Sequence, residues 1–242
     1  MGQLENLKKD LYALANKEKA TLLSGFFKTA PGQYGAGDVF IGVMVPEQRK
    51  VAKEYHDLPL TDVVRLLHSK EHEYRLTALI ILADQYSCAH WSVKNKIYDI
   101  YLANTKWINN WDLVDLSAPR IVGDFLVNRN KKPLTKLAHS KDLWERRIAI
   151  ISTLAFIKER EYAETFRIAK ILLKDDHDLI HKAVGWMLRE VGKRCGHEDN
   201  DALGQVILTK FLDKYYTKMP RTMLRYAIER LSPSQKRKYM KK

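Results

Sequence analysis

A long amphipathic segment shows the pattern of the whole chain: Leu143-Trp-Glu-Arg-Arg147-Ile-Ala-Ile-Ile-Ser-Thr-Leu-Ala-Phe-Ile-Lys158. Its apolar residues recur at the spacing that gives a helix one buried side. The segment that begins at Arg147 resembles three others in the chain. The four read Arg147-Ile-Ala-Ile, Arg75-Leu-Thr-Ala, Lys182-Ala-Val and Arg225-Tyr-Ala-Ile. Because similar segments recur along the chain, the stretch predicts a repeat protein.

The expected repeating unit is a pair of helices. Arg75, Trp111, Arg147, Lys182 and Arg225, taken as equivalent residues, are separated by 36, 36, 35 and 43 positions. Units of this length are typical of HEAT and armadillo arrays, and no alternation of apolar and polar residues is long enough for a sheet. The expected second helices of the pairs are Glu73–Tyr86, Trp111–Val127, Leu143–Lys158, Leu179–Arg194 and Arg221–Leu231.

We therefore predict an all-α, HEAT/armadillo-like helical-repeat solenoid that forms a single curved domain over residues 1–231. Its second helices are expected to line one face. Residues 232–242 are rich in Lys and Arg and are expected to form a frayed basic tail that adds affinity for nucleic acid.

The N-terminal region is predicted to be helical on both sides of a loop. Residues 3–28 have helical periodicity and form one helix or two short ones. Pro46 suits the first turn of a further helix. Between them, 28–38 contains several glycines, but it lacks the spacing of a phosphate-binding loop. We interpret this loop as a long connector.

The charge indicates the class of partner. Lys and Arg total 42 and Asp and Glu total 29, so the net charge is +13, which favours a polyanion such as nucleic acid. Two cysteines fit a reducing compartment. There is no N-terminal signal and no apolar run long enough for a membrane helix. A soluble, cytoplasmic protein without a membrane partner is expected.

Residues 104–124 depart from the plain helical pattern. Trp111 and Asp115 lie four apart and share one face of a helix, with Asp112 beside them. An aromatic ring beside a carboxylate suits the binding of a cationic group. Pro119 cannot bond the carbonyl of Asp115, so the helix either kinks there or a new helix starts near Ser117. In the alternative interpretation, one of the two aspartates caps that second helix and Trp111 belongs to the core.

The helix expected over 179–194 has a basic side. Lys182, Trp186, Arg189 and Lys193 form one stripe, and the apolar residues fall on the other side. Such a stripe suits a surface that follows phosphates. It equally suits a solvated face with Trp186 folded against a neighbouring helix. Arg147 lies at the edge of the apolar side of its helix and is either paired structurally or directed into the groove.

Other catalytic or metal patterns are weak. Cys195-Gly-His197-Glu198-Asp199 is a single cluster in a connector, and we interpret it as a structural loop. No His-Glu-x-x-His and no Gly-x-Ser-x-Gly occurs. No metal and no cofactor is expected.

Several ordered motifs resemble the AlkD-type DNA alkylation repair glycosylases, over nearly the whole chain. They are Gly35-Ala-Gly-Asp38 through Gly42-Val-Met-Val-Pro46, Asn109-Asn-Trp111-Asp-Leu-Val-Asp115, Trp144-Glu-Arg-Arg147-Ile-Ala, Lys182-Ala-Val-Gly-Trp186-Met-Leu-Arg189-Glu and Met219-Pro-Arg-Thr-Met-Leu-Arg-Tyr-Ala-Ile-Glu229. The resemblance implies a HEAT-like fold and removal of positively charged alkylated purines from DNA. Asn110 is a departure, because some members have a second Trp there.

By this resemblance, Asp115 corresponds to the catalytic aspartate. Trp111 and Trp186 correspond to its aromatic contacts with the damaged nucleotide, and Arg147 to the arginine that grips the backbone. The expected DNA contacts are Lys182, Arg189, Lys193 and Arg146.

The function expected from the sequence is a monofunctional alkylpurine DNA glycosylase of base excision repair. We expect it to act as a monomer on double-stranded DNA containing N3-methyladenine or N7-methylguanine. Two alternatives stay open. One is a noncatalytic HEAT-repeat protein that recognises damaged or branched DNA, and the other is a scaffold that binds an acidic protein.

Overall fold

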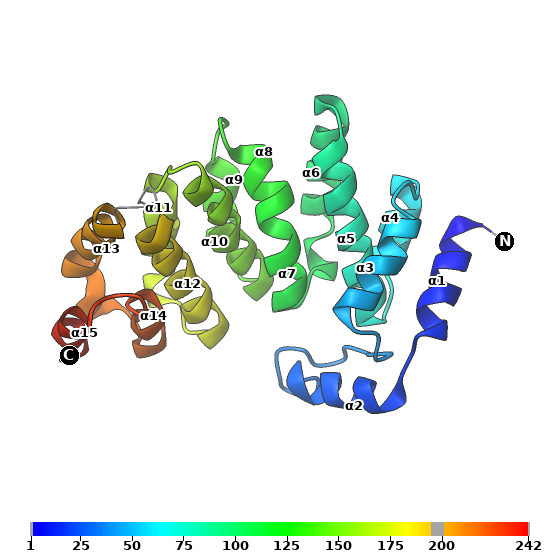
Figure 1. Ribbon diagram of the computed structural model, residues 1–242, viewed down its shortest axis with the longest axis horizontal. Coiled ribbons are helices and arrows are strands. Elements are labelled where there is room, and N and C mark those ends of the chain that lie inside the picture. The colour runs from blue at the N-terminus through cyan, green and yellow to red at the C-terminus, as the bar shows by residue number, and fades with distance from the viewer. Residues whose placement is uncertain (1, 195–200, 242) are drawn as a thin grey trace. The chain divides into compact units, whose positions relative to one another are not determined.

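The structure is a computed structural model that describes residues 2–194 and 201–241 (Figure 1). The described residues are helical, and their one bridge of strand type joins Val39 to Glu71. The prediction of an all-helical repeat fold is therefore confirmed. Two compact units divide the chain, Met1–Ile121 and Val122–Lys242.

The first unit holds seven numbered helices. Residues 3–28 form two short helices and not one. The bounds are α1 Gln3–Ala13, α2 Lys17–Phe26, α3 Val45–Glu54, α4 Leu60–Leu67, α5 His72–Cys88, α6 Trp91–Ala103 and α7 Trp111–Ala118. Buried leucines at helical spacing hold α1 to the core, and α5 contacts α3, α4, α6 and α7. Pro46 lies in the first turn of α3, as predicted.

The second unit continues the pairs. Its helices are α8 Asp124–Leu126, α9 Lys132–Ala138, α10 Leu143–Lys158, α11 Ala163–Ile171, α12 Asp178–Arg194, α13 Asp201–Tyr215, α14 Arg221–Ala227 and α15 Pro233–Met240. The second helices α10, α12 and α14 pack in succession. Gly185 permits the close approach of α12 to α14, because a Cβ atom there would lie 2.5 Å from the carbonyl oxygen of Met223.

A basic residue at the fourth position of several second helices fastens the turn before it. Nη1 of Arg75 donates to the carbonyls of Ser69 and Lys70, at 3.2 and 2.9 Å. Its Nη2 donates to Asp38 at 2.6 Å. The guanidinium thus satisfies two backbone carbonyls of the connector between α4 and α5.

Arg146 in α10 repeats this arrangement. It donates to the carbonyls of Ser140 and Lys141, at 3.1 and 2.9 Å, and to Asp175 at 2.6 Å. His181, also fourth in its helix, bonds the carbonyl of Asp175. The structural counterpart of Arg75 is therefore Arg146, not Arg147, so the predicted equivalence is displaced by one residue.

Of the two alternatives predicted at Pro119, a new helix near Ser117 does not form. The helix that begins at Trp111 instead continues through a π-helical segment, Pro119–Gly123, into α8. A π turn widens the helix, and such segments mark irregular positions that are common at functional sites. Pro119 lies at the start of this turn because it has no N–H to donate to the carbonyl of Asp115.

The prediction that residues 232–242 form a frayed tail is wrong for those that the structure describes. Pro233–Met240 form α15, which Ser232 caps by accepting from the backbone of Gln235. Tyr239 is buried, and its hydroxyl donates to Asp213 at 2.9 Å. The ring of Tyr239 also meets that of Tyr216 edge-on, with centroids 5.4 Å apart, and so anchors the segment, which the count of lysines and arginines does not reveal.

Candidate functional site

The expected site residues divide between the two units. Trp111 and Asp115 lie on α7 of the first unit. Those of the second unit are Arg146, Arg147, Lys182, Trp186, Arg189 and Lys193. The prediction that the second helices line one face stays a prediction for these two groups.

Helix α7 begins at Trp111, and Asn110 caps it by accepting from the backbone N–H of Trp111 at 2.8 Å. Trp111 and Asp115 are both half-buried and lie one turn apart. No second helix starts near Ser117, so neither Asp112 nor Asp115 caps one. Trp107 is not on the same face, because it ends a separate 3₁₀ turn and stacks on His68, with the two rings 4.9 Å apart.

The ring of Trp111 is held in an aromatic cluster. Phe27 stacks on it with ring centroids 5.1 Å apart, and Phe26 meets it edge-on at 5.8 Å. The indole Nε1 donates to the hydroxyl of Tyr34 at 3.2 Å. One face and one edge of the indole are thus occupied by the protein, which orients the ring.

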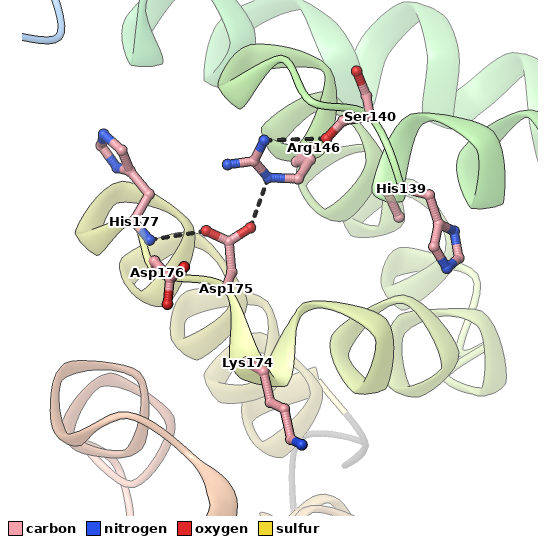
Figure 2. Close-up of a pocket in the computed structure, with 8 residues that line it drawn as sticks. His139, Ser140, Arg146, Lys174, Asp175, Asp176 and His177 are labelled. Atoms are coloured by element: carbon pink, nitrogen blue, oxygen red, sulfur yellow. Dashed lines mark hydrogen bonds and ion pairs between the residues drawn. The ribbon is translucent and has the colours of Figure 1, made fainter.

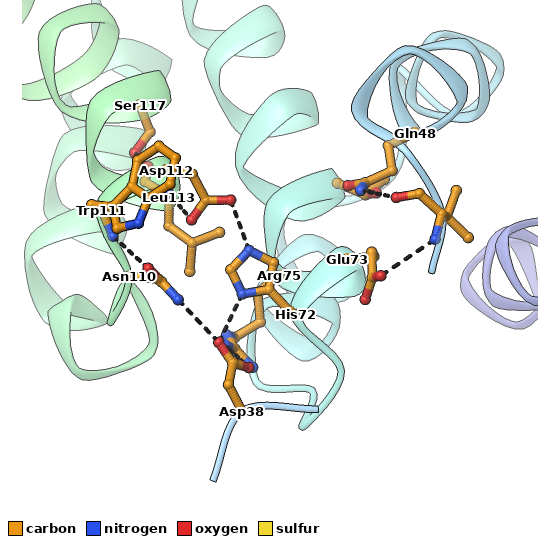
Figure 3. A network of polar contacts seen from close by, with 12 residues as sticks. Asp38, Gln48, His72, Glu73, Arg75, Asn110, Trp111, Asp112, Leu113 and Ser117 are labelled. Atoms are coloured by element: carbon orange, nitrogen blue, oxygen red, sulfur yellow. Dashed lines mark hydrogen bonds and ion pairs between the residues drawn. The ribbon is translucent and has the colours of Figure 1, made fainter. Parts of the chain in front are cut away.

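A buried polar network lies beneath this cluster (Figure 3). His72, the first residue of α5, bonds Asp38 through Nδ1 and Asp112 through Nε2, both at 2.8 Å. Asp38 also accepts from Arg75 at 2.6 Å and from Asn110 at 3.4 Å. The side chains of His72 and Asp38 are 2% and 4% exposed, so these bonds are shielded from water.

The network is charged at neutral pH. Burial opposes the charged imidazole, but the carboxylates of Asp112 and Asp38 outweigh it and raise the pKa of His72 to about 9. Burial likewise acts to raise the pKa of Asp38, and the bonds from His72 and Arg75 lower it overall. Phe27 and Phe40 cover the imidazole, with ring centroids at 5.1 and 4.5 Å.

Another buried carboxylate holds residues 41–43, which follow the loop at 28–38. Glu73, almost fully buried, accepts from the backbone N–H groups of Ile41, Gly42 and Val43, at 3.1, 2.7 and 3.3 Å. Gly42 has φ of +83°, a conformation that favours glycine. Its missing Cβ also lets the carbonyl of Asn16 approach closely.

These contacts correct the interpretation of residues 28–38 as a connector. The loop supplies Tyr34 and Asp38 to the surroundings of Trp111, and its continuation supplies Phe40. Asn110, the departure from the resembled motif, is fully buried as the cap of α7 and as a donor to Asp38. Sequence reasoning missed these residues together with His72.

In the second unit, Arg147 is only 5% exposed, and its Nη1 donates to the carbonyl of Leu179 at 2.6 Å. This bond ties α10 to the start of α12. Of the two predicted interpretations, structural pairing therefore accounts for at least part of the role of Arg147. Arg147, Lys182 and Arg225 are each the fifth residue of successive second helices, and so is Asp115 in α7, whereas Trp111 is the first residue of its helix.

The predicted core side of α12 is buried as expected, at Val184, Leu188 and Val191. Its basic stripe is partly neutralised. Lys182 pairs with Asp178 at 2.7 Å, and Arg189 pairs with Glu229.

The rest of the stripe is open to solvent to different degrees. Lys193 is exposed, and Trp186 is half-buried. The indole Nε1 of Trp186 donates to Glu190 at 3.2 Å, so one edge of this ring is bonded within its own helix.

Arg146 borders a hollow of about 430 Å³ between the turns that precede α10 and α12 (Figure 2). The ion pair of Arg146 and Asp175 lines the hollow, as do His139 and His177. Burial lowers the pKa of His177, and the nearby Arg146 adds to that. Because Arg146 bonds Asp175 and two backbone carbonyls, it holds the turn before α10 to the turn before α12.

Among the residues that the structure describes, no group of three or more potential metal ligands occurs, and no helix has the length and apolarity to cross a membrane. The predicted structural loop at Cys195, His197, Glu198 and Asp199 lies outside the described residues.

The fold and the α7 site define a helical-repeat protein with a tryptophan and a carboxylate on one helical face. A family model, DNA alkylation repair enzyme, matches residues 7–231, so the chain belongs to that family. A solved structure, a predicted DNA alkylation repair enzyme from Enterococcus faecalis, superposes with a TM-score of 0.67 at 17% identity, over 90% of this chain and 97% of that one. This likeness shows a shared fold. No curated protein sequence matches the chain.

Proposed function

We propose that the chain is a DNA glycosylase that excises positively charged alkylated purines, N3-methyladenine and N7-methylguanine, from duplex DNA. The observation that carries the proposal is the pair of Trp111 and Asp115, half-buried one turn apart on α7 in a member of the DNA alkylation repair family. An excess of 13 positive charges suits a DNA substrate.

The chemistry needs little from the protein. A purine alkylated at N3 or N7 carries a positive charge and is a good leaving group. Cleavage of its glycosidic bond builds oxocarbenium character on the deoxyribose. The carboxylate of Asp115 stabilises that charge and positions the attacking water. No step requires a metal or a redox cofactor.

The aromatic rings supply binding. The indole of Trp111, fixed by Phe27 and Tyr34, offers a π face to the cationic nucleotide. Trp186 serves the same purpose from the second unit. Arg147 and Lys182 add positive charge for the DNA backbone, and Arg147 also holds the start of α12.

The test is release of free base. The protein is incubated with duplex DNA that contains one N7-methylguanine, and the products are separated by chromatography. Release of N7-methylguanine with an abasic strand is expected. Tight binding of the duplex without release would overturn the proposal and favour a noncatalytic protein that recognises damaged DNA.

A further inference from the structure

The first turn of α7 is held by contacts that come from distant parts of the chain. Asp112 accepts from the ring of His72, and Asn110 donates to Asp38. The indole of Trp111 donates to Tyr34. These partners lie 40 to 77 positions away in the sequence. One network of hydrogen bonds therefore joins the loop at 28–38 to α5 and α7.

Asp38 and His72 are the centre of that network. Asp38 accepts from His72, Arg75 and Asn110, which belong to α5 and to the cap of α7. His72 faces a carboxylate with each ring nitrogen. Because ionised carboxylates only accept hydrogen bonds, the imidazole needs an N–H on both nitrogens.

Helix α10 is a useful comparison within the same chain. Its first turn is capped locally, because Asp142 accepts from the backbone N–H groups of Trp144 and Glu145, at 2.7 and 3.1 Å. That arrangement satisfies the helix start without a second segment of chain. Helix α7 has a local cap in Asn110 and, in addition, the buried charges of Asp38, His72 and Asp112.

Buried charges are an inefficient way to stabilise a fold, because their desolvation offsets most of their attraction. What they provide well is one fixed geometry when every bond is satisfied. Here the geometry that they fix is the start of the helix that carries Trp111 and, one turn on, Asp115.

We propose that Asp38, His72 and Asp112 are positioning residues that hold the first turn of α7, so that the ring of Trp111 and the carboxylate of Asp115 meet the damaged nucleotide in register. This proposal rests on the proposed function. None of the three residues touches the reacting atoms. A displacement of about 1 Å at such a site lowers a rate by up to about 10²-fold.

The experiment compares two variants with a matched control. Asp38→Asn and Asp112→Asn keep the size of the side chain and remove the charge. Asp112 is the milder site because its side chain is 16% exposed, so Asp112→Asn serves if Asp38→Asn fails to fold. The control, Gln85→Ala, removes two 2.8 Å hydrogen bonds to the carbonyls of His56 and Leu58 at the far end of α5.

Two sets of measurements are made on the full chain. The first is the single-turnover rate of N7-methylguanine release, alongside the Kd for the same duplex. The second is the fluorine NMR resonance of 5-fluorotryptophan at position 111, assigned with Trp111→Phe. We expect both Asn variants to lower the rate about tenfold or more, to leave Kd within about twofold, and to move or broaden the Trp111 resonance. The control is expected to change none of these.

The outcomes separate the two proposals. If the wild-type protein releases no base, the proposed function fails, and the Trp111 resonance alone decides the positioning proposal. A folded Asp112→Asn protein with an unmoved Trp111 resonance and a wild-type rate overturns it. So does an equal effect of Gln85→Ala, because the network would then act only through general stability.

Discussion

At the scale of single residues, Asp115 is the group on which the proposed reaction depends. Asp115→Asn keeps the size and hydrogen bonding of the side chain but removes the charge that would face an oxocarbenium ion. We expect base release to fall about 10²-fold or more, the loss typical of one electrostatic stabiliser, with little change in DNA binding. Single-turnover release from a duplex that contains N7-methylguanine measures the effect.

The control for that variant is Asp99→Asn, at an exposed carboxylate on α6 of the same unit. It removes one negative charge and so corrects for any general gain in DNA affinity. Normal release by a folded Asp115→Asn protein would show that the carboxylate has no part in catalysis.

His72 gives the molecule a predictable response to pH. Burial opposes the charged imidazole, but the facing carboxylates of Asp112 and Asp38 outweigh it and raise the pKa of His72 in the folded protein to about 9, above the ordinary 6.5. Because this pKa is raised on folding, protonated His72 contributes its full share to the free energy of unfolding below about pH 6.5. That contribution is lost as the pH rises towards 9. The contribution is on the order of 3 kcal/mol.

The measurement is urea unfolding at pH 6, 7.5 and 9.5 for the wild type and for His72→Gln. The free energy of unfolding of the wild type is expected to fall more steeply with rising pH than that of the variant. Lysines and tyrosines titrate in both proteins, so the difference between the two isolates His72. Equal slopes would mean that folding does not raise the pKa of His72.

The limits of sequence reasoning are clearest at this scale. The four-residue spacing of Trp111 and Asp115 is visible in the sequence because it is local. The bonds from His72 to Asp38 and to Asp112 span 34 and 40 positions and follow no period. The sequence does contain a pattern that indicates the role of Arg75. Ser69-Lys-Glu-x-x-x-Arg75 has a counterpart in Ser140-Lys-Asp-x-x-x-Arg146, and both arginines bond the carbonyls of the turn before their helix.

At the scale of elements, α12 tests how the second unit meets DNA. Lys193 is exposed, whereas Arg189 is paired with Glu229. Removing a free phosphate contact reduces the slope of log affinity against log salt by about one. We therefore expect Lys193→Gln to flatten the slope by about one and Arg189→Gln to flatten it by less, because the loss of Arg189 also frees Glu229.

Titration of undamaged duplex at several salt concentrations provides the slopes. Lys96→Gln, on the first helix α6 of a pair, is the control because the second helices are the ones expected to line the DNA-facing side. An unchanged slope for Lys193→Gln would mean that this part of α12 does not meet DNA. An equal effect of Arg189→Gln would mean that DNA opens its ion pair.

Helix positions follow from the sequence more closely than their contacts do. The bounds of α10 agree with the predicted Leu143–Lys158 because a long amphipathic pattern with the Asp142 cap leaves little choice. The irregular continuation at Pro119–Gly123 was not predicted, since a proline alone does not distinguish a kink from a π turn.

For the molecule as a whole, we expect damaged bases to be selected by their positive charge and not by the fit of a pocket. Enzymes that remove neutral damaged bases flip them into a fitted pocket and protonate the leaving group. The small cavity lined by Phe27, His72 and Asp112 holds about 40 Å³, room for about one water molecule, whereas ligand pockets usually hold 300 Å³ or more. The sequence offers no general acid next to Asp115.

A cationic lesion needs neither a fitted pocket nor a general acid, because its own charge weakens the glycosidic bond and binds a tryptophan face. We expect the protein to release N7-methylguanine and N3-methyladenine, to tolerate bulkier cationic adducts, and to leave uracil, hypoxanthine and 8-oxoguanine in place. Duplexes that carry each lesion are incubated with the same protein preparation, and the free bases are quantified by chromatography. Efficient release of uracil or hypoxanthine would require a base pocket and an acid elsewhere in the chain, and would refute selectivity by charge.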